Sequence, residues 1–528
     1  MNKSVSDKLA FPFVAVAILG FSSIPFLLGK SAETDALAFR GTYTDTADYA
    51  VHLAMMQAGR LGEWAYQLRF TSEEHNPAFI RLFYILLGHL SRLLNLDVET
   101  VFHAARWLFG LTALFAFDRL FHKAFPQKAH ARFAFFLAVL GGGVGWLQLI
   151  LGAPLEPISP IDLWLIDAYI LFSISLFPAF SFTLTLMAAA LYFFLQFLED
   201  GEWRNVVWVS LLAVTSQMMN PIAFAVVDLS MAGAVLFTWW KHRKIDFKQG
   251  YALLLIAVVQ VPLLLYNLWV LALDPIWSQF TRQNETLSPP LIFYLWGFAP
   301  FWLFAIVGII RSLRERNPAM GAMSVWVAGG FFLAYLPVLI QRRFLLGVPI
   351  PLGALAIYGF QFLMAKLPAS LQALKRRESL LCFTYVLFAS VSSLFLILNS
   401  SLYVLTQPKA LFYPREIQAA AQWLDENAAP GDFVLADVQT SQILAQRTRL
   451  KVYVGHEMET LYFHNKESAM KAYFNGTISA EWLSQTPVRW VVYGPYEAEI
   501  NASFLPDSTL TLVHQNDAVK IYEVNLER

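Results

Sequence analysis

The sequence predicts an α-helical polytopic membrane protein that carries a soluble α/β domain at its C-terminus. Of the 528 residues, 57% are hydrophobic and only 14% are charged, whereas soluble domains carry about 25% charged residues. Apolar stretches long enough to cross a bilayer recur up to Tyr403. Beyond Tyr403 the composition changes to alternating helix-like and strand-like segments, which is typical of a separate soluble domain.

Apolar stretches of about 20 residues predict transmembrane helices. The first follows Lys3 and Lys8 as in a signal peptide, but it is longer than the usual apolar core of about 7–15 residues, so we expect a retained helix. We predict about eleven spans, at 9–29, 101–121, 132–152, 179–198, 205–219, 222–240, 251–271, 291–310, 319–340, 345–363 and 379–403.

The stretch 78–96 contains Arg81, His89 and Arg92 and suits an interfacial amphipathic helix better than a span. With this assignment, basic residues gather in alternate connections between spans, as the positive-inside rule requires. The sequence therefore predicts an N-in, C-out topology. Counting 78–96 as a span would reverse every later loop and remove this bias.

The topology leaves three extracytoplasmic segments. They are a long first loop at 30–100 and a second loop at 153–178, both within a transmembrane domain of residues 1–403, and a C-terminal domain of residues 404–528. The last combines helix-like stretches with short strand-like ones (FVLADV, KVYVG, VRWVVYG, TLTLVHQ and VKIYEV), which predicts a small α/β domain. It contains neither a GxGxxG nor a P-loop motif, so nucleotide binding has no support there.

The first-loop segment TDTADYAVHLAMMQAGRLGEW (44–64) holds the most informative acids. It predicts a helix from near Thr44 that places Asp45, Asp48 and His52 on one face. One interpretation is structural, with Thr44 as N-cap and acids in the first turn. The other is catalytic, because a carboxylate at the mouth of a helix bundle can deprotonate an acceptor hydroxyl.

Further candidates carry similar alternatives. Glu73, Glu74 and His75 precede Pro77, which we expect to start the interfacial helix, so they form either a site or a solvated turn. Arg342 and Arg343 interrupt apolar sequence at the outer boundary, where they either snorkel to lipid headgroups or clamp a phosphate. The second loop adds Glu156, Asp162 and Asp167 as an acidic element, or as ordinary loop acids.

Other features limit the possible functions. The formal net charge is zero, which gives no sign of a nucleic-acid partner, and the single cysteine, Cys382, excludes intramolecular disulfides and CxxC chemistry. Asp228 lies inside a predicted span and is interpreted as a cavity or packing residue. Four aromatic residues near the outer face could stack on sugar or form an interfacial belt: Trp64, Tyr66, Trp164 and Trp277.

The layout resembles the membrane-integral GT-C glycosyltransferase superfamily, and most closely uncharacterised bacterial members of the dolichyl-phosphate-mannose mannosyltransferase type. Their first loop runs as an acid before YxxHLA, then GxxGxW and H-x-P. The matching residues here are Asp48-Tyr49, His52-Leu53-Ala54, Gly59, Gly62, Trp64 and His75-Asn76-Pro77, and QRRF and VYVGHEMET also look familial.

The resemblance implies an inverting transfer of a sugar from a polyprenyl-phosphate donor to a glycan, lipid or protein acceptor, in cell-envelope glycan biosynthesis at the outer face of a bacterial inner membrane. A first-loop aspartate would be the general base: the general superfamily pattern fits Asp45 and the closer subgroup fits Asp48. Arg342 and Arg343 would hold the donor phosphate, and His52, His75, Tyr49 and Glu74 would line the substrate site.

The resemblance leaves a divalent metal open, because some relatives need one and others none. Mg²⁺ or Mn²⁺ would suit hard oxygen ligands such as Asp45, Asp48 and Glu156. The main alternative function is a transporter or flippase of a lipid-linked saccharide, although the sequence shows no convincing pair of inverted repeats.

Overall fold

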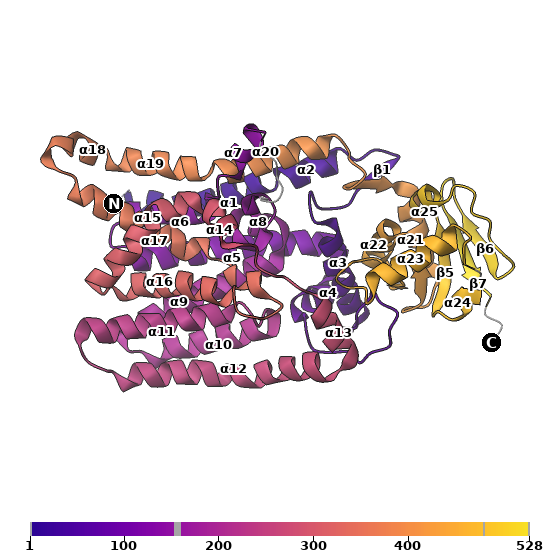
Figure 1. Cartoon of the computed structure of the whole chain (residues 1–528), viewed down its shortest axis with the longest axis horizontal. Helices are drawn as coiled ribbons and strands as arrows, with labels where there is room; N and C mark the ends of the chain where they lie inside the picture. The colour runs from indigo at the N-terminus through magenta and orange to yellow at the C-terminus, as the bar shows by residue number, and fades with distance from the viewer. Residues whose placement is uncertain (1–2, 153–159, 479–480, 526–528) are drawn as a thin grey trace. The chain divides into compact units, whose positions relative to one another are not determined.

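The computed structural model describes residues 3–152, 160–478 and 481–525. The chain divides into two compact units (Figure 1). The first unit comprises Met1–Ile24, Ala105–Tyr266 and Glu285–Asn399, and the second comprises Pro25–Ala104, Asn267–Asn284 and Ser400–Arg528. The second unit thus combines the first loop with the C-terminal tail.

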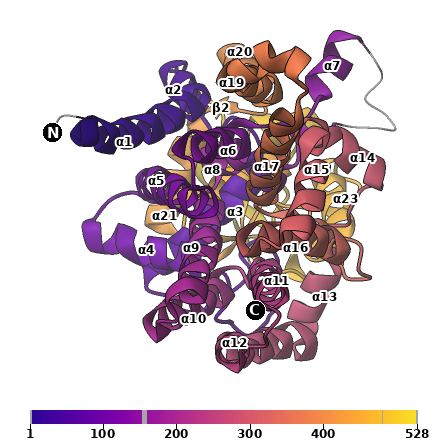
Figure 2. The ribbon, with the colours of Figure 1, turned by 90° about the vertical axis from the view of Figure 1, so that its left-hand side faces the viewer.

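The first unit is helical, and several of its helices are seen nearly end-on in Figure 2. Its helices are α1 (Lys3–Ser22), α6 (Lys128–Leu140), α7 (Gly145–Ile150), α8 (Ile170–Leu176), α9 (Pro178–Asp200), α10 (Trp203–Met219), α11 (Phe224–His242), α14 (Leu291–Gly297), α15 (Ala299–Glu315), α16 (Pro318–Leu333), α17 (Pro349–Lys366), α18 (Gln372–Arg376) and α19 (Glu378–Ala389). Short 3₁₀ helices are η1 (Ile161–Leu163), η2 (Ile166–Ala168), η3 (Gln341–Leu345) and η4 (Ala369–Leu371). Four helices run from one unit into the other: α2 (Ile24–Ser31), α5 (Val98–Ala124), α12 (Phe247–Leu273) and α20 (Val391–Leu405).

Each of the predicted apolar stretches coincides with a helix or with a broken pair of helices. Among the described residues, four helices are long and apolar enough to cross a membrane, or up to eight if each bent pair counts as one span. The bends within these pairs range from 42° between α19 and α20 to 113° between α17 and the segment Ala369–Arg376. Glycines 141–143 separate α6 from α7, because glycine is a poor helix former. The count of eleven spans and the N-in, C-out orientation stay predictions.

Glycines bring the central helices of the first unit close together. Helix α15 packs on α17, and α11 packs on α16. A Cβ added to Gly308 would collide with the carbonyl oxygen of Leu355, and one added to Gly359 would collide with that of Phe304. Both glycines therefore let the backbones of α15 and α17 touch, which larger residues would prevent.

Glycines also let the two helices of the first loop, α3 (Thr46–Leu61) and α4 (Leu82–Leu94), pack closely. A Cβ on Gly59 would collide with the carbonyl oxygen of Ile85, and one on Gly88 would collide with that of Met56. Gly62 ends α3 in the left-handed conformation, with φ of 100°, and its amide donates to carbonyls at the end of the helix. The two glycines of the GxxGxW motif therefore have structural roles: Gly59 allows the contact with α4, and Gly62 ends α3.

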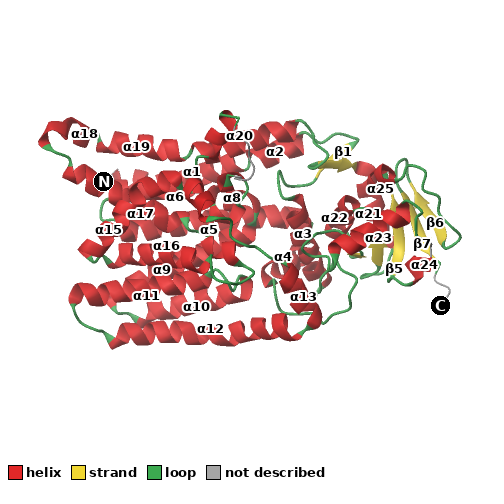
Figure 3. Cartoon of the chain, in the orientation of Figure 1, coloured by secondary structure: helices red, strands yellow, loops and turns green. Residues whose placement is uncertain are grey.

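The tail contains a small sheet with helices, as expected (Figure 3), and its division from the rest of the chain at residue 404 stays a prediction. All five predicted strands are present: β3 (Phe433–Leu435), β4 (Lys451–Val452), β5 (Val488–Tyr493), β6 (Leu510–Gln515) and β7 (Lys520–Val524). Their order is β4-β3-β5-β7-β6, with β3 parallel to β4 and β5, and β7 antiparallel to β5 and β6. The helices of the tail are α21 (Arg415–Asn427), α22 (Val438–Arg447), α23 (Phe463–Phe474), α24 (Glu481–Ser484) and α25 (Pro495–Ile500).

A second, smaller sheet ties the tail to the first loop. Strand β1 (Leu37–Phe39) pairs antiparallel with β2 (Phe412–Pro414), and Ala38 lies opposite Tyr413. Nearby, Lys30 pairs with Glu99 at 2.8 Å, and Glu99 also lies 3.6 Å from Arg447 of α22. Helix α22 packs on α3, where Gln57 donates to the carbonyl oxygen of Gln446 at 3.1 Å. The first loop and the tail are therefore one packed body.

Candidate active site

The site is built around the first turn of α3. The helix begins at Thr46 and not at Thr44, and its N-cap is Asp45, which has a left-handed backbone (φ 52°) and makes no side-chain capping bond. The expectation that Thr44 caps this helix is therefore wrong. The carbonyl of Thr44 instead accepts a hydrogen bond from Thr42 Oγ1 at 2.8 Å, which holds the chain in a turn before the helix. Asp48 lies in the first helical turn.

Asp48 contacts a histidine from the tail. His456 Nε2 lies 3.0 Å from Asp48 Oδ1. The side chain of His456 is 7% exposed, whereas that of Asp48 is 52% exposed. The structure thus holds one oxygen of the carboxylate from the protein side and leaves half of the side chain open to solvent.

Backbone hydrogen bonds assign the tautomer of His456. The amides of Met458 and Glu459 donate to His456 Nδ1 at 3.0 and 3.3 Å, so in the neutral ring Nε2 carries the proton and donates it to Asp48. Burial lowers the pKa of His456, but the hydrogen bond and charge of Asp48 raise it, and the net shift is upward. A proton on Nδ1 would face two N–H groups. We therefore favour the neutral ring, although the nearby carboxylates alone would favour the protonated ring.

The segment that carries His456 is fixed from several sides. Helix α13 (Pro275–Gln283) contributes Gln283, whose amide donates to the carbonyl oxygen of Thr460 at 2.8 Å, and the adjacent Asn284 donates to that of Met458 at 2.7 Å. Arg81 pairs with the buried Glu459 at 2.6 Å. Two separate parts of the chain, the end of α13 with Asn284 and the residue Arg81, thus hold the segment that carries the imidazole.

Tyr49 and His52, both predicted to bind substrate, pack against aromatic rings. The buried Tyr49 hydroxyl lies 3.3 Å from His103 Nε2, and its ring meets Phe102 edge-on. His52 stacks on Tyr84 with ring centroids 4.2 Å apart. Tyr49 is therefore part of the packing behind the site.

His75 has a structural role. Its Nε2 accepts from the amide of Leu68 at 2.9 Å, and its Nδ1 lies 2.7 Å from the carbonyl oxygen of Glu73, so both ring nitrogens are engaged. Burial lowers the pKa of His75, which keeps the ring neutral. Glu73 pairs with Lys466 of the tail at 2.7 Å, whereas Glu74 is exposed.

The structure separates the four aromatic candidates. Tyr66 is fully buried and Trp277 is 1% exposed, with its Nε1 donating to the carbonyl oxygen of Asn76 at 3.0 Å. The expectation that these two could stack on sugar is wrong, because neither ring face is accessible. Trp64 and Trp164 are exposed, and Trp64 stacks on His89 with centroids 4.1 Å apart.

Arg342 and Arg343 lie in η3 of the first unit. The guanidinium of Arg342 lies over the ring of Trp164, 5.4 Å from its centroid, and Arg343 is exposed. Burial raises the pKa of Asp167 of the second loop, and the charges of the two arginines act against this. A cationic surface with guanidinium donors therefore sits beside the second loop.

Asp162 of the second loop is buried. Its Oδ2 accepts hydrogen bonds from the amide of Gly145 at 3.0 Å and from the Ser392 hydroxyl. This carboxylate ties together three segments of the first unit. Glu156, the remaining acid of this loop among the candidates, lies outside the described residues.

No group of three or more His, Cys, Asp or Glu side chains that could hold a metal ion occurs within residues 3–152, 160–478 and 481–525. Asp45 and Asp48 are described, so neither belongs to such a group there.

The sequence did not single out His456, Glu459 or Arg81 as site residues. The signal was present, since His456 and Glu459 both lie in VYVGHEMET. A histidine and an acid in a loop after a strand are common, however. Only their tertiary contacts distinguish these two: the partner of His456 lies 408 positions earlier in the sequence, and that of Glu459 lies 378 positions earlier.

No protein-family model matches the sequence, and no curated protein matches it either. Solved structures do. The crystal structure of ArnT from Cupriavidus metallidurans bound to undecaprenyl phosphate has a TM-score of 0.53 at 13% identity, over 98% of this chain and 98% of that one. Apo ArnT has a TM-score of 0.54 at 14% identity, over 99% and 98%.

The arabinofuranosyltransferase AftD from Mycobacteria has a TM-score of 0.53 at 14% identity, and the match covers 97% of this chain but only 41% of AftD. ArnT and AftD are GT-C glycosyltransferases, so the chain has the GT-C fold that its sequence resembles. The narrower likeness to the dolichyl-phosphate-mannose type stays a prediction.

Proposed function

We propose that this protein is an inverting glycosyltransferase that moves a sugar from a polyprenyl-phosphate donor to an acceptor at the extracytoplasmic face of the membrane. One observation carries the proposal: a half-exposed carboxylate, Asp48, is held by a buried histidine of the tail. The GT-C fold supports it, because a structure with this fold contains bound undecaprenyl phosphate.

Asp48 would act as the general base. As the acceptor oxygen attacks the anomeric carbon, its proton passes to the carboxylate, and the bond from that carbon to the phosphate oxygen breaks. Attack from the side opposite the leaving phosphate inverts the anomeric configuration. Such proton transfer typically contributes a factor of about 10²–10⁴ in rate.

His456 would orient this base. Its Nε2–H donates to one carboxylate oxygen, which fixes the rotamer of Asp48. Charge is conserved in this step. Asp48 loses its negative charge when it takes the proton, and the leaving polyprenyl phosphate gains one when the bond to the sugar breaks.

Arg342 and Arg343 would bind the donor phosphate. Guanidinium groups match phosphate oxygens in bidentate geometry and stay charged at every working pH. The guanidinium of Arg342 lies over the ring of Trp164, which supports the proposal. An arginine already held by a ring loses less side-chain entropy when it binds phosphate.

The test uses the purified full-length protein in proteoliposomes, with polyprenyl-phosphate sugars labelled in the sugar and a mixture of candidate acceptors. The proposal predicts release of unlabelled polyprenyl phosphate and formation of a labelled product. Movement of intact labelled donor between leaflets, without bond cleavage, would instead show a transporter and contradict the proposal.

A further inference from the structure

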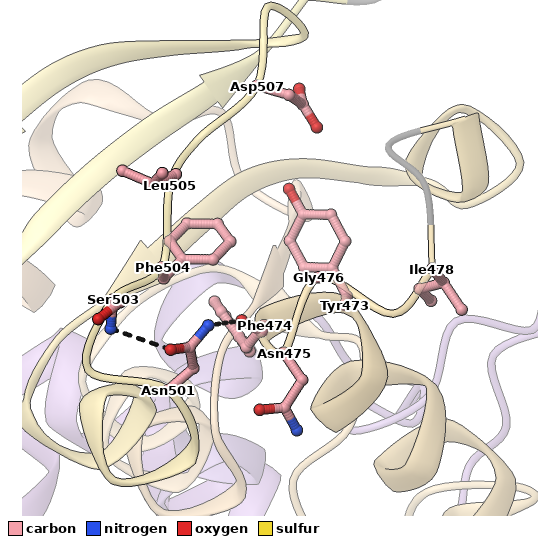
Figure 4. A pocket seen from close by; sticks show the side chains of 10 residues that line it. All are labelled: Tyr473, Phe474, Asn475, Gly476, Ile478, Asn501, Ser503, Phe504, Leu505 and Asp507. Atoms are coloured by element: carbon pink, nitrogen blue, oxygen red, sulfur yellow. Dashed lines mark hydrogen bonds between the residues drawn. The ribbon is translucent and has the colours of Figure 1, made fainter.

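A cavity in the tail lies away from the residues described above. It has a volume of about 250 Å³ and lies between the end of α23 and the segment that joins α25 to β6 (Figure 4). Pockets for drug-sized ligands span about 300–1,000 Å³, so this one suits a smaller group. The α23 side contributes Tyr473 and Asn475, and the joining segment contributes Asn501, Ser503, Phe504 and Asp507.

The cavity contains a buried hydroxyl that lacks a partner. Tyr473 is 4% exposed, and its Oη has no hydrogen-bond partner among the described residues. In Figure 4 this hydroxyl points along the cavity toward Asp507. A buried polar group without a partner costs free energy, and such a group in a native structure needs an explanation. A ligand hydroxyl would supply the missing bond.

Polar groups at the rim could complete the set. No hydrogen bond is recorded in the described structure for the side-chain amide of Asn475 or the hydroxyl of Ser503, and both residues are exposed. Asn501 differs, because its amide donates to the carbonyl oxygen of Phe474 at 2.9 Å and its oxygen accepts from the Ser503 amide. Asn501 therefore shapes the cavity, whereas Asn475 and Ser503 can bind.

An aromatic ring forms one wall. Phe504 stacks on Tyr493 with centroids 5.2 Å apart and planes inclined by 21°, and its side chain is partly exposed. A ring supported in this way on one face can present its remaining surface to the C–H face of a sugar.

The charge of the lining selects between ligand classes. Among the described residues that line the cavity there is no lysine or arginine, and Asp507 is the single carboxylate. An anionic ligand would meet no compensating cation there, whereas the Asp507 carboxylate, the Asn475 amide and the hydroxyls of Tyr473 and Ser503 match a polyol.

We propose that this cavity is an ancillary binding site for one neutral saccharide unit, which Tyr473 Oη and the Asn475 amide bind through hydrogen bonds. The inference does not depend on the transfer reaction. The site would hold a neutral sugar of a glycan whether or not that glycan is the acceptor.

The test measures binding of methyl glycosides of glucose, galactose, mannose and N-acetylglucosamine by saturation-transfer NMR, with glucuronic acid as the anionic comparison. The full-length protein in nanodiscs is used, with Tyr473→Phe and Asn475→Ala. Tyr462→Phe is the matched control, because Tyr462 is exposed and lies outside the cavity.

At least one neutral glycoside should bind saturably, and Tyr473→Phe should weaken it about tenfold, the value of one hydrogen bond of ~1.4 kcal/mol. Tyr462→Phe should leave binding unchanged. Tyr473→Phe should also keep or raise the melting temperature, because it deletes an unpartnered buried hydroxyl.

Three results would overturn the proposal: no saturable binding of any neutral glycoside, unchanged binding by both cavity variants, or tighter binding of glucuronic acid. Asp48→Asn separates the saccharide site from the transfer reaction. This variant should bind the neutral glycosides as the wild type does, although it should transfer no sugar.

Discussion

Two acids in outer loops, Asp48 of the first and Asp162 of the second, have opposite surroundings. Asp48 is half-exposed, and its Oδ1 lies 3.0 Å from Nε2 of the buried His456. Asp162 is 4% exposed, and a backbone amide and the Ser392 hydroxyl both donate to its Oδ2. The first can meet a substrate, while the second holds segments of the chain together. The comparison shows that the exposure of a loop carboxylate decides whether it can meet a substrate.

The largest effects should come from removing each acid. Asp48→Asn should lower the rate of sugar transfer at least about 100-fold, because the amide cannot accept a proton. Asp162→Asn should keep the rate per folded molecule but lower the melting temperature, since the two hydrogen bonds to Oδ2 would lose their charged acceptor. Transfer assays with tryptophan-fluorescence melting curves check both. A large loss of rate in Asp162→Asn with unchanged stability would remove the distinction.

The next effect concerns the donor. Arg342→Ala or Arg343→Ala should raise the KM for the polyprenyl-phosphate sugar by about 10–100-fold, the range for a lost hydrogen bond to a charged group. Arg342→Lys should recover only part of this, because lysine lacks the planar fork. Arg282→Ala, which removes an exposed arginine of α13, is the control. Equal KM values in all variants would argue for simple snorkelling.

A smaller effect should follow from loss of the histidine that holds Asp48. His456→Ala should lower kcat about tenfold with little change in KM, whereas His456→Gln should recover part of the rate because its amide can still donate to Asp48. His464→Ala is the control, since that side chain is 81% exposed. If His456→Ala and His456→Gln behave alike, the histidine only fills space.

The last effect is on stability and not on the rate of transfer, and it concerns a third acid, Glu497, which is fully buried in the tail. Its oxygens accept from the amides of Asp437 and Gly494 at 2.7 and 2.8 Å, and burial raises its pKa from 4.5 to about 7. A raised folded-state pKa contributes stability below pH 4.5 that is lost as the pH rises through about 7.

The melting temperature of the wild type should therefore fall between pH 5 and pH 8 by more than that of Glu497→Gln, which cannot titrate. The difference in free energy of unfolding should be at most on the order of 3 kcal/mol. Parallel pH profiles in the two proteins would show that Glu497 does not titrate in this range.

The fold was predictable where the determinants are local. Apolar length predicted the helices, and alternating β-branched and aromatic residues predicted all five strands of the tail sheet. The sequence also predicted that Asp48 lies in the first turn of a first-loop helix, although that helix begins at Thr46 and has Asp45 as its N-cap. The pairing of β1 with β2 could not be predicted, because β1 has three residues and its partner lies far along the chain.

The site was harder to predict for the same reason. His75 and His456 look alike in sequence, yet both nitrogens of His75 serve the turn around it, and His456 reaches a carboxylate 408 positions away. Trp277 and Trp64 are also alike in sequence. Trp277 is buried and donates to a backbone carbonyl, whereas Trp64 is exposed. Only tertiary contacts separate such pairs.

The most direct test compares the rates of polyprenyl phosphate release by Asp48→Asn and Asp45→Asn in the same proteoliposome assay. Asp45 is the N-cap residue of α3, and Asp48 is the acid hydrogen-bonded to His456. The rate of Asp48→Asn should therefore be at least about tenfold lower than that of Asp45→Asn, with donor binding intact in both. Equal rates, the reverse order or full activity in both variants would contradict the assignment of Asp48 as the base.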